Sequence, residues 1–487
     1  MWQKVKAAMK TQFLETALLS LLLVGMSFNV FNIASVAFSQ KTRQVPAEHS
    51  TIQEAIDASN PGDAVHVSKG TYYEHLVITK DRLMLIGENS NTTIIDGNQT
   101  GVVIRVSANN VTITGFTIRG SGEGKEGIYL DHFSNSTIVD NVIHNCSVGI
   151  RVSNGSGDKI IGNTIADNED SGIILQVNTI DTYIDGNSIT NNRYVGINMF
   201  AYADNNTISE NIIMNNGYSG IQIYLASGNN INGNILMLNE RGISFLGQRA
   251  SYNSISSNVI AQNIYGIDFM EAFAPRYNVI YHNDIIGNTY QLQGNSSGNI
   301  WSNTASEGNY WSDYEGEDLD SDGIGETKTP HRGVDSYPLD NPRSLIPLIL
   351  NGQLYRVRLR SSSVVSGFYF KQESKEIDFK VIGPIGTQGY CNITIPKNLL
   401  NPMASQSWIV LLDGVSVGYY TIAENATSTS LYFIYNHSIH NVRITVDGSG
   451  NLIFYIIVII VASVLILGIA VAIIKRKQRD RKLPHTN

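Results

Sequence analysis

The sequence contains very little cysteine, which limits the kinds of site it can form. Only two cysteines occur in 487 residues, Cys146 and Cys391. They fall in what we predict below to be different domains, which argues against a disulfide, and their spacing does not match a zinc site. We therefore interpret both as buried thiols.

The body of the chain is also short of positive charge. The net charge is −8; the last thirteen residues contribute +5 and residues 1–40 contribute +2, which leaves −15 for the rest. A body this acidic argues against nucleic acid and against an anionic membrane surface as its partner.

Amphipathic helical patterns of ten residues are missing from the repeats, which excludes leucine-rich and helical repeat folds. What recurs instead is the dipeptide Gly-Ile, at intervals of 22 to 24 residues. Its glycines are Gly127, Gly149, Gly172, Gly196, Gly220, Gly242 and Gly266.

Asparagine recurs in the same phase. One asparagine lies two residues before an aliphatic residue, at Asn141, Asn163, Asn187, Asn211, Asn234, Asn258 and Asn283. A second follows five residues later, at Asn168, Asn192, Asn216, Asn239, Asn263 and Asn288, with Cys146 in this place in the first copy. Three markers in one phase indicate a solenoid.

Each copy contains three short apolar alternations, which predicts one coil of a parallel β-helix. The isoleucines fill the bore, and stacked asparagines form the corners, because asparagine tolerates left-handed backbone and can bond to its equivalent in the next coil. Residues 51–59 are expected to form a short helix that covers the first coil, with Ser50 as its N-cap and Gln53 completing a capping box.

A family resemblance rests on three parts of the sequence. They are "TIQEAIDASNPGDAVHVSKGTYYEHLVI", the repeated coils, and "GNYWSDYEGEDLDSDGIGETKTP" with the later "DSYPL". Over residues 46–345 the chain resembles the NosD-like branch of the pectin-lyase-like β-helices, also described as carbohydrate-binding and sugar-hydrolysis repeats. The resemblance implies a right-handed helix in a surface or periplasmic setting and does not by itself imply an activity.

The sequence divides into six segments. The β-helix is predicted at 46–305, its acidic tail at 306–345 and a β-sandwich, from alternating strands such as "QLYRVRLR" and "WIVLLDG", at 348–448. Residues 452–474 are uncharged and long enough to span a membrane, and the basic residues 475–487 would then lie in the cytoplasm. Residues 1–39 read as a signal peptide or an uncleaved anchor. The fold class is therefore all-β with one C-terminal transmembrane helix, and the large N-terminal part is expected outside the cell.

Glycosylation sequons of the form N-x-S/T are frequent on this outward part, and some are expected to carry glycan if the organism glycosylates. They lie at Asn91, Asn98, Asn110, Asn135, Asn145, Asn154, Asn205, Asn295, Asn392, Asn425 and Asn436.

An acidic stretch in the tail has the spacing of a calcium loop. The expected ligands are Asp318, Asp320, Asp322, the carbonyl of Ile324, and Glu326, with Gly323 at the turn. Thr329 stands where a bidentate glutamate is usual, so a further ligand is expected from Asp313, Asp335 or Asp340. We predict structural calcium here; a solvated acidic turn is the alternative.

The outer side of the Gly-Ile strands is the candidate carbohydrate site. Aromatic rings beside amides suit sugars, because C–H faces stack on rings and hydroxyls need donors and acceptors. The candidate residues are Tyr129, Asn198, Phe200, Gln222 and Tyr224. Tyrosine is also a common strand residue, so a purely structural role is the alternative.

Catalysis at this face has less support. Asp131 and Asp268 lie six coils apart, roughly 29 Å, which is too far for the carboxyl pair of a glycosidase. A lyase or epimerase needs a base and charge neutralisation instead. Tyr129, Asp131, His132 and Arg151 are the candidate residues for it; a salt-bridged outer edge is the alternative.

Copper has little support from the sequence, because the methionines are spread over separate coils and only His437 and His440 form a close histidine pair. We predict a single-pass cell-surface protein that binds or organises polysaccharide without turnover. A polysaccharide lyase or epimerase is the first alternative, and a copper-insertion accessory protein is the second.

Overall fold

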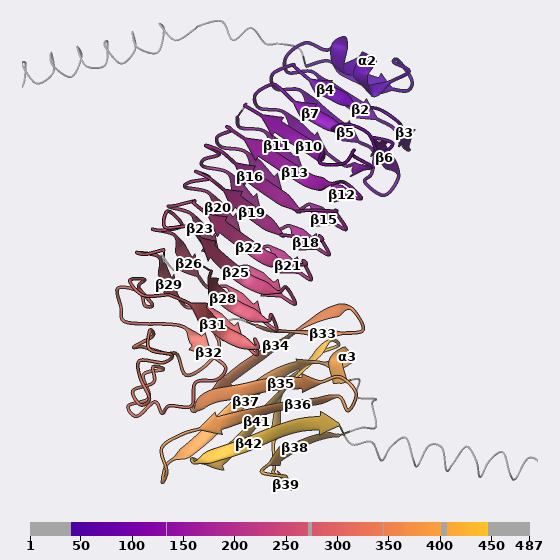
Figure 1. Ribbon diagram of the computed structural model, residues 1–487. Coiled ribbons are helices and arrows are strands. Elements are labelled where there is room, and N and C mark those ends of the chain that lie inside the picture. The colour runs from indigo at the N-terminus through magenta and orange to yellow at the C-terminus, as the bar shows by residue number, and fades with distance from the viewer. Residues whose placement is uncertain (1–39, 133, 271–274, 344, 401–406, 447–487) are drawn as a thin grey trace, which may run out of the picture.

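The computed structural model describes residues 40–132, 134–270, 275–343, 345–400 and 407–446. Its larger part is a stack of coils, and each coil contributes one short strand to each of three parallel sheets (Figure 1). Because parallel crossover connections are right-handed in proteins, the helix is of the right-handed type. The predicted parallel β-helix is confirmed.

Sheet A has eleven strands. They are β1 (Thr42–Val45), β2 (Ala64–Val67), β5 (Met84–Gly87), β8 (Thr112–Thr114), β11 (Thr137–Val139), β14 (Lys159–Ile161), β17 (Tyr183–Asp185), β20 (Thr207–Ser209), β23 (Asn230–Asn232), β26 (Ser254–Ser256) and β29 (Val279–Tyr281). Sheet B also has eleven strands. They are β3 (Gly70–Tyr72), β6 (Thr93–Asp96), β9 (Thr117–Arg119), β12 (Val142–His144), β15 (Thr164–Ala166), β18 (Ser188–Thr190), β21 (Ile212–Met214), β24 (Ile235–Met237), β27 (Val259–Ala261), β30 (Asp284–Ile286) and β32 (Tyr310–Trp311).

Sheet C has ten strands and contains the Gly-Ile marker. They are β4 (Leu76–Ile78), β7 (Ile104–Val106), β10 (Glu126–Asp131), β13 (Val148–Ser153), β16 (Ile173–Gln176), β19 (Ile197–Phe200), β22 (Ser219–Tyr224), β25 (Arg241–Leu246), β28 (Tyr265–Phe269) and β31 (Tyr290–Gly294).

The bore of the helix is filled as the sequence predicts. Ile128 pairs with Ile150 in the next coil, and both side chains are fully buried. The marker glycines form one file against the backbone of the following coil: a Cβ added to Gly149 would come within 2.5 Å of the backbone oxygen of Gly172. The file of glycines is therefore a steric requirement of close coil stacking.

Both predicted asparagine files are continuous ladders. In the first, the side-chain amide of Asn163 donates to Oδ1 of Asn187 over 3.0 Å. In the second, the amide of Asn168 donates to Oδ1 of Asn192 over 2.9 Å. These side chains are buried, so the amides satisfy one another and the corner backbone away from water.

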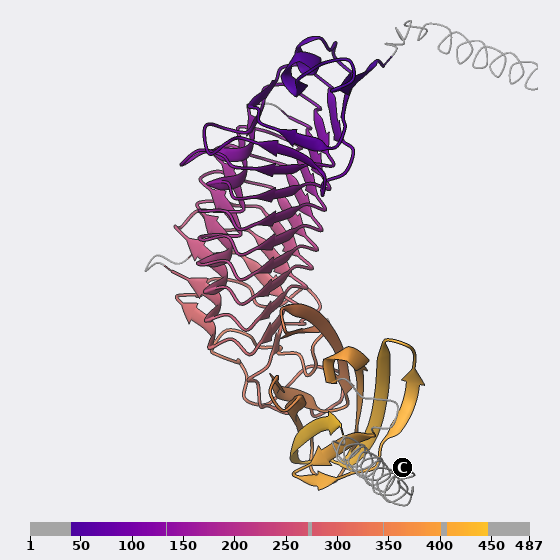
Figure 2. The same cartoon turned by 90° about the vertical axis from the view of Figure 1, so that its right-hand side faces the viewer.

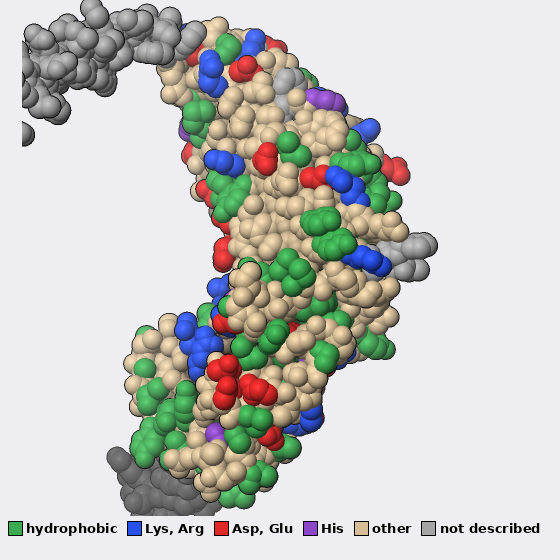
Figure 3. Space-filling view, turned by 90° about the vertical axis from the view of Figure 1, so that its left-hand side faces the viewer, with side chains coloured by type: hydrophobic (Ala, Val, Ile, Leu, Met, Phe, Trp, Pro, Cys, Tyr) green, Lys and Arg blue, Asp and Glu red, His purple; other side chains and the backbone are tan. Residues whose placement is uncertain are grey.

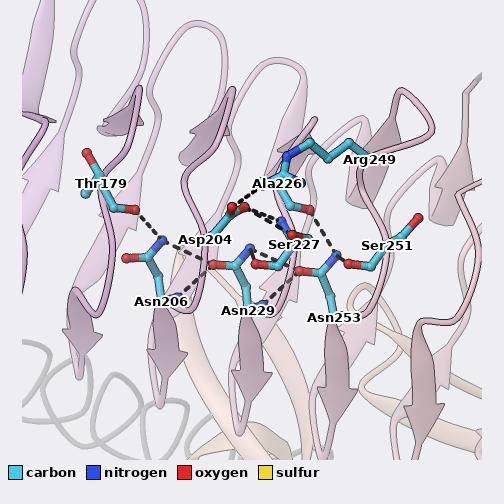
Figure 4. A network of polar contacts seen from close by, with 9 residues as sticks. All are labelled: Thr179, Asp204, Asn206, Ala226, Ser227, Asn229, Arg249, Ser251 and Asn253. Carbon is cyan, nitrogen blue, oxygen red and sulfur yellow. Dashed lines mark hydrogen bonds and ion pairs between the residues drawn. The ribbon is translucent and has the colours of Figure 1, made fainter.

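A third ladder lies at the corner between sheets C and A (Figure 4). There Asn206 donates to Asn229 over 3.1 Å and Asn229 donates to Asn253 over 3.0 Å. We did not assign this file from the sequence, although its asparagines also precede an aliphatic residue by two positions.

The predicted helix at the first coil is α2 (Ile52–Asp57), and it buries Ile52 and Ile56. The predicted cap is wrong by one residue: Thr51 is the N-cap, and Glu54 completes the capping box. Glutamate prevails over Gln53 because N3 must lie three residues after the true cap.

After the last coil, the chain forms two five-stranded antiparallel sheets (Figure 2). One contains β33 (Ile346–Leu350), β34 (Gln353–Ser361), β37 (Gln388–Pro396), β41 (Ser428–Asn436) and β40 (Tyr420–Glu424). The other contains β35 (Val364–Lys371), β36 (Glu376–Ile382), β42 (Ile439–Val446), β38 (Trp408–Leu412) and β39 (Val415–Ser416), and α3 (Lys397–Leu400) follows β37. Apolar residues of both sheets share one buried cluster, as in a β-sandwich.

The sandwich is held against the end of the β-helix. The Tyr310 hydroxyl donates to the Val365 carbonyl over 2.7 Å, and the Gly367 N–H donates to the Ser312 carbonyl over 2.6 Å. Val364 joins the core of the β-helix itself. The sandwich therefore covers the last coil, as α2 covers the first.

Three predictions lie outside the described residues: the signal or anchor at 1–39, the transmembrane segment at 452–474 and the basic cytoplasmic tail at 475–487. Within the ranges that the structure describes, no helix has the length and apolar character needed to cross a membrane.

Candidate functional site

The outer face of sheet C presents the rows expected from the sequence. Strand register places Tyr129, Arg151, Ile174, Asn198, Gln222, Ser244 and Asp268 in one row. A second row contains Asp131, Ser153, Gln176, Phe200, Tyr224 and Leu246.

At the N-terminal end of this face, three of the four candidate catalytic residues lie together. His132 Nδ1 is 2.5 Å from Asp131 Oδ1, and Tyr129 shares a hydrogen bond with Asp131. The fourth, Arg151, turns away: it bonds Glu126 over 2.6 Å and Gln176 over 2.7 Å.

Arg105 takes the position beside Asp131 that was expected for Arg151. Its guanidinium donates to Asp131 Oδ2 over 2.7 Å and lies 4.7 Å from the centre of the Tyr129 ring. It comes from β7, where Val103-Ile104 replaces the Gly-Ile marker, so it was not counted among the copies. The interval of 24 residues from Tyr129 to Arg105 was the signal that could have found it.

The pKa values of this cluster are shifted in opposite directions. Burial raises the pKa of the Tyr129 hydroxyl. Burial also acts to raise the pKa of Asp131, but hydrogen bonds from His132 and Tyr129 outweigh it and leave that pKa below its usual range. The cluster thus holds a neutral phenol beside an ionised carboxylate that is salt-bridged to Arg105, with the exposed His132 at its edge.

The candidate sugar-stacking residues form a close pair farther along the face. The Phe200 and Tyr224 ring centres are 4.9 Å apart, and the rings are tilted by 45°. Asn198 and Gln222 lie beside them in the first row, but Gln222 is buried and so is the Oδ1 atom of Asn198, which differs from the accessible amides that the sequence suggested. Because the rings are tilted, their faces are not fully covered by each other.

A second aromatic file follows the opposite edge of sheet C and differs in kind. Tyr194 stacks on Tyr218 with an interplanar angle of 9°, Tyr265 stacks on Tyr290 at 16°, and Arg241 lies between the two pairs. Stacking along the helix axis leaves mainly ring edges toward solvent. This file, which we did not predict, therefore suits coil stacking better than sugar binding. The distance in sequence between each member of the file and the marker glycine changes by one residue along the file. The file was therefore not recognised in the sequence.

The acidic loop gathers four of its expected ligands. Carboxylate oxygens of Asp318, Asp320, Asp322 and Glu326 lie within 4.8 Å of one another. Backbone N–H groups fix them: Ser321 and Gly323 donate to Asp318, and Ile324 donates to Asp322. Burial, with the nearby charges of Asp322 and Asp320, raises the pKa of Asp318. On the side shown in Figure 3, carboxylates gather near the end of the β-helix.

The structure separates the three candidates for the missing ligand. Asp313 pairs with His331 and Arg332. Asp335 ends the first asparagine ladder and accepts from Asn309 and Trp311. Asp340 lies against the loop, where its N–H donates to the Gly323 carbonyl over 3.1 Å and its Oδ2 accepts from Asn341 over 2.6 Å. Burial raises the pKa of Asp340 to about 7, and Asp318 adds to the shift.

Soft donors for copper do not gather in the described part of the chain. Burial raises the pKa of the Cys146 thiol to about 11 and also raises that of Cys391. Met199 and Met237 are fully buried apolar residues, and His440 is bonded to Asp413. In these ranges, the acidic loop is the one group of three or more histidine, cysteine or carboxylate ligands close enough to hold an ion. These donors do not fit copper.

A family model described as "Periplasmic copper-binding protein (NosD)" matches residues 36–198, 125–250 and 177–316. The overlapping matches cover more than half of the chain.

Among curated proteins, the cell surface glycoprotein of Methanothermus fervidus is 34% identical over 133 residues. That stretch is 27% of this chain and 21% of the glycoprotein, so the match spans about a fifth of that relative.

Among solved structures, pectate lyase Pel9A has a TM-score of 0.40 at 15% identity, over 55% of this chain and 83% of the lyase. The A-module of the Azotobacter vinelandii mannuronan C-5 epimerase AlgE4 has a TM-score of 0.39 at 19% identity, over 51% of this chain and 94% of the module.

Proposed function

The chain belongs to the NosD family, and from this premise we propose that it is a cell-surface β-helix protein that binds polysaccharide on sheet C without altering it. The periplasmic description of the family and the name of the M. fervidus relative support a position outside the cytoplasm.

The tilted Phe200–Tyr224 pair is the observation that carries the proposal. Phe200 is 38% exposed, and its ring lies against that of Tyr224 on the outer face of sheet C. An exposed ring matches the C–H face of a sugar, and the polar hydroxyls of the sugar would remain largely toward water, because Gln222 beside the rings is only 6% exposed.

A glycan array probed with the full-length protein tests this role. The double substitution Phe200→Ala and Tyr224→Ala is expected to weaken glycan binding at least tenfold while the protein stays folded, because both side chains point outward. The matched control is Tyr183→Ala with Tyr390→Ala, which removes two exposed rings from other faces. Equal loss in both variants, or unfolding of the first, would contradict the assignment.

A polysaccharide lyase or epimerase is the second candidate, favoured by the contact of Tyr129, Asp131 and His132. The exposed His132 is the group placed to exchange a proton with a ligand, and Arg105 would supply positive charge. Analysis of array ligands for new unsaturated or epimerised sugars tests it; turnover that Asp131→Asn abolishes would replace binding as the function.

We also propose that the acidic loop binds calcium as a structural ion, with Asp318, Asp320, Asp322 and Glu326 as its carboxylate ligands. Asp340 is the best placed of the three candidates to complete the set, because its backbone N–H donates to the Gly323 carbonyl of the loop over 3.1 Å, whereas Asp313 pairs with Arg332 and Asp335 accepts from Asn309. A copper-insertion role would require donors that the described residues do not bring together.

A further inference from the structure

Four arginines on or beside sheet C each have a carboxylate partner: Arg105, Arg151, Arg241 and Arg249. Arg241 bonds Asp268 over 2.8 Å and Glu240 over 2.5 Å, and the Tyr218 and Tyr265 rings cover it at 4.4 and 5.2 Å. It is therefore neither free nor accessible to an acidic ligand.

Arg249 is held in the same way at the corner between sheets C and A. It pairs with Asp204 and lies 4.6 Å from the centre of the Tyr202 ring. Farther along the face, Arg105 is paired with Asp131 and Arg151 with Glu126. Two exposed arginines lie farther from the pair: Arg193 precedes β19 at the opposite edge of the sheet, and Arg276 follows β28, three coils beyond Phe200.

An acidic polysaccharide needs cations on the surface that binds it. Taking a guanidinium from its carboxylate would leave that carboxylate unpaired, which is strongly unfavourable where the pair is buried. The body of the chain, at −15, also repels polyanions over distances of about a Debye length.

We infer that the ligand of this face is an uncharged polysaccharide, an inference that rests on the proposed glycan-binding role. A neutral chain offers C–H faces to the tilted rings, and it leaves each ion pair on the face intact.

The test compares oligosaccharides of equal length from neutral mannan and dextran with those from alginate and polygalacturonate. Affinities are measured for the full-length protein in a detergent without a sugar headgroup. We expect a neutral series to bind at least tenfold more tightly than the uronates, with an affinity that hardly changes between 50 and 500 mM salt. Tighter binding of the uronates would overturn the inference but leave carbohydrate binding intact, and failure of every glycan on the array would overturn both.

The substitution Asp204→Asn adds an independent check. It frees Arg249 while Oδ1 can still accept from the Ser227 N–H, so uronate affinity is expected to rise at least threefold with neutral binding unchanged. Asp181→Asn, an exposed carboxylate at the start of a sheet A strand, is the control for the change in net charge. An equal rise in both variants, or no rise in the first, would show that ion pairing does not set the ligand class.

Discussion

Asn187 donates both its side-chain amide and its backbone N–H to Oδ1 of Asn211, each over 2.9 Å. Asn211 in turn donates to the Ile184 carbonyl and to Oδ1 of Asn234, also over 2.9 Å. One buried amide thus joins backbone and side chains of three coils. This arrangement makes the corners of the helix interdependent.

Asn211→Ala is expected to lower the free energy of unfolding by more than about 3 kcal/mol, because it leaves several buried partners without a hydrogen bond. Urea unfolding followed by circular dichroism measures the loss. Asn230→Ala, an exposed position at the start of β23, is the control and should change stability by less than about 0.5 kcal/mol. Similar losses in the two variants would show that the ladder does not stabilise the fold.

Asp158 occupies a rung of the third file where later coils have asparagine. The Ser136 N–H donates to its Oδ1 over 2.8 Å, but its Oδ2 and the Oγ1 of Thr182 in the next coil are buried without partners. Burial raises the pKa of Asp158 to about 7 from an ordinary value of 3.8.

Between about pH 4 and 7, Asp158 is therefore protonated in the folded state and ionised in the unfolded state. Stability is expected to fall by up to about 1.4 kcal/mol per pH unit across this window and then to level off. Asp158→Asn should remove this component and raise the melting temperature at pH 8, because the amide cannot ionise. Melting curves of both forms from pH 4 to 8 measure it, with Asp181→Asn as the exposed control; parallel curves for wild type and Asp158→Asn would contradict it.

The coil architecture could be predicted because its determinants repeat at nearly fixed intervals. Gly149 and Asn187 are required by backbone approach and by buried hydrogen bonds, so each leaves the same mark in every coil. The asparagines of the third ladder recur in the same way, but Ser136, Asp158 and Thr182 take their place in the first coils. This change of residue type prevented the file from being recognised in the sequence. The cap of α2 was misplaced because Ser50 and Thr51 are both good N-caps and only the backbone decides between them.

The candidate site was less predictable, because its contacts depend on side-chain direction. Register brought Tyr129 and Asp131 to the outer face, but only the structure shows that Arg105 bonds Asp131 while Arg151 bonds Glu126. Likewise, a tyrosine in the sequence does not show whether its ring lies stacked, as Tyr218 does, or tilted, as Tyr224 does.

Arg241→Gln is expected to cost about 3–5 kcal/mol of stability, because it leaves the buried carboxylate of Asp268 without its charged partner. Adding Asp268→Asn should recover part of this loss, since the remaining buried group is then neutral. Urea unfolding of the two single variants and the double variant gives the coupling energy. Arg193→Gln removes an exposed arginine nearby as the control; purely additive effects of the first two substitutions would show that the pair is not coupled.

Calcium is expected to raise the melting temperature of the full-length protein. Four carboxylates within 4.8 Å of one another repel, and a hard divalent cation makes their convergence favourable in the folded loop while hardly binding the unfolded chain. The shift should be lost in Asp320→Ala, kept in Asp57→Ala on α2, and not reproduced by copper. Because a solenoid passes stability only between neighbouring coils, hydrogen exchange should slow in residues 309–314 and not in α2. A melting temperature that stays constant through a calcium titration would show that the loop is a solvated acidic turn.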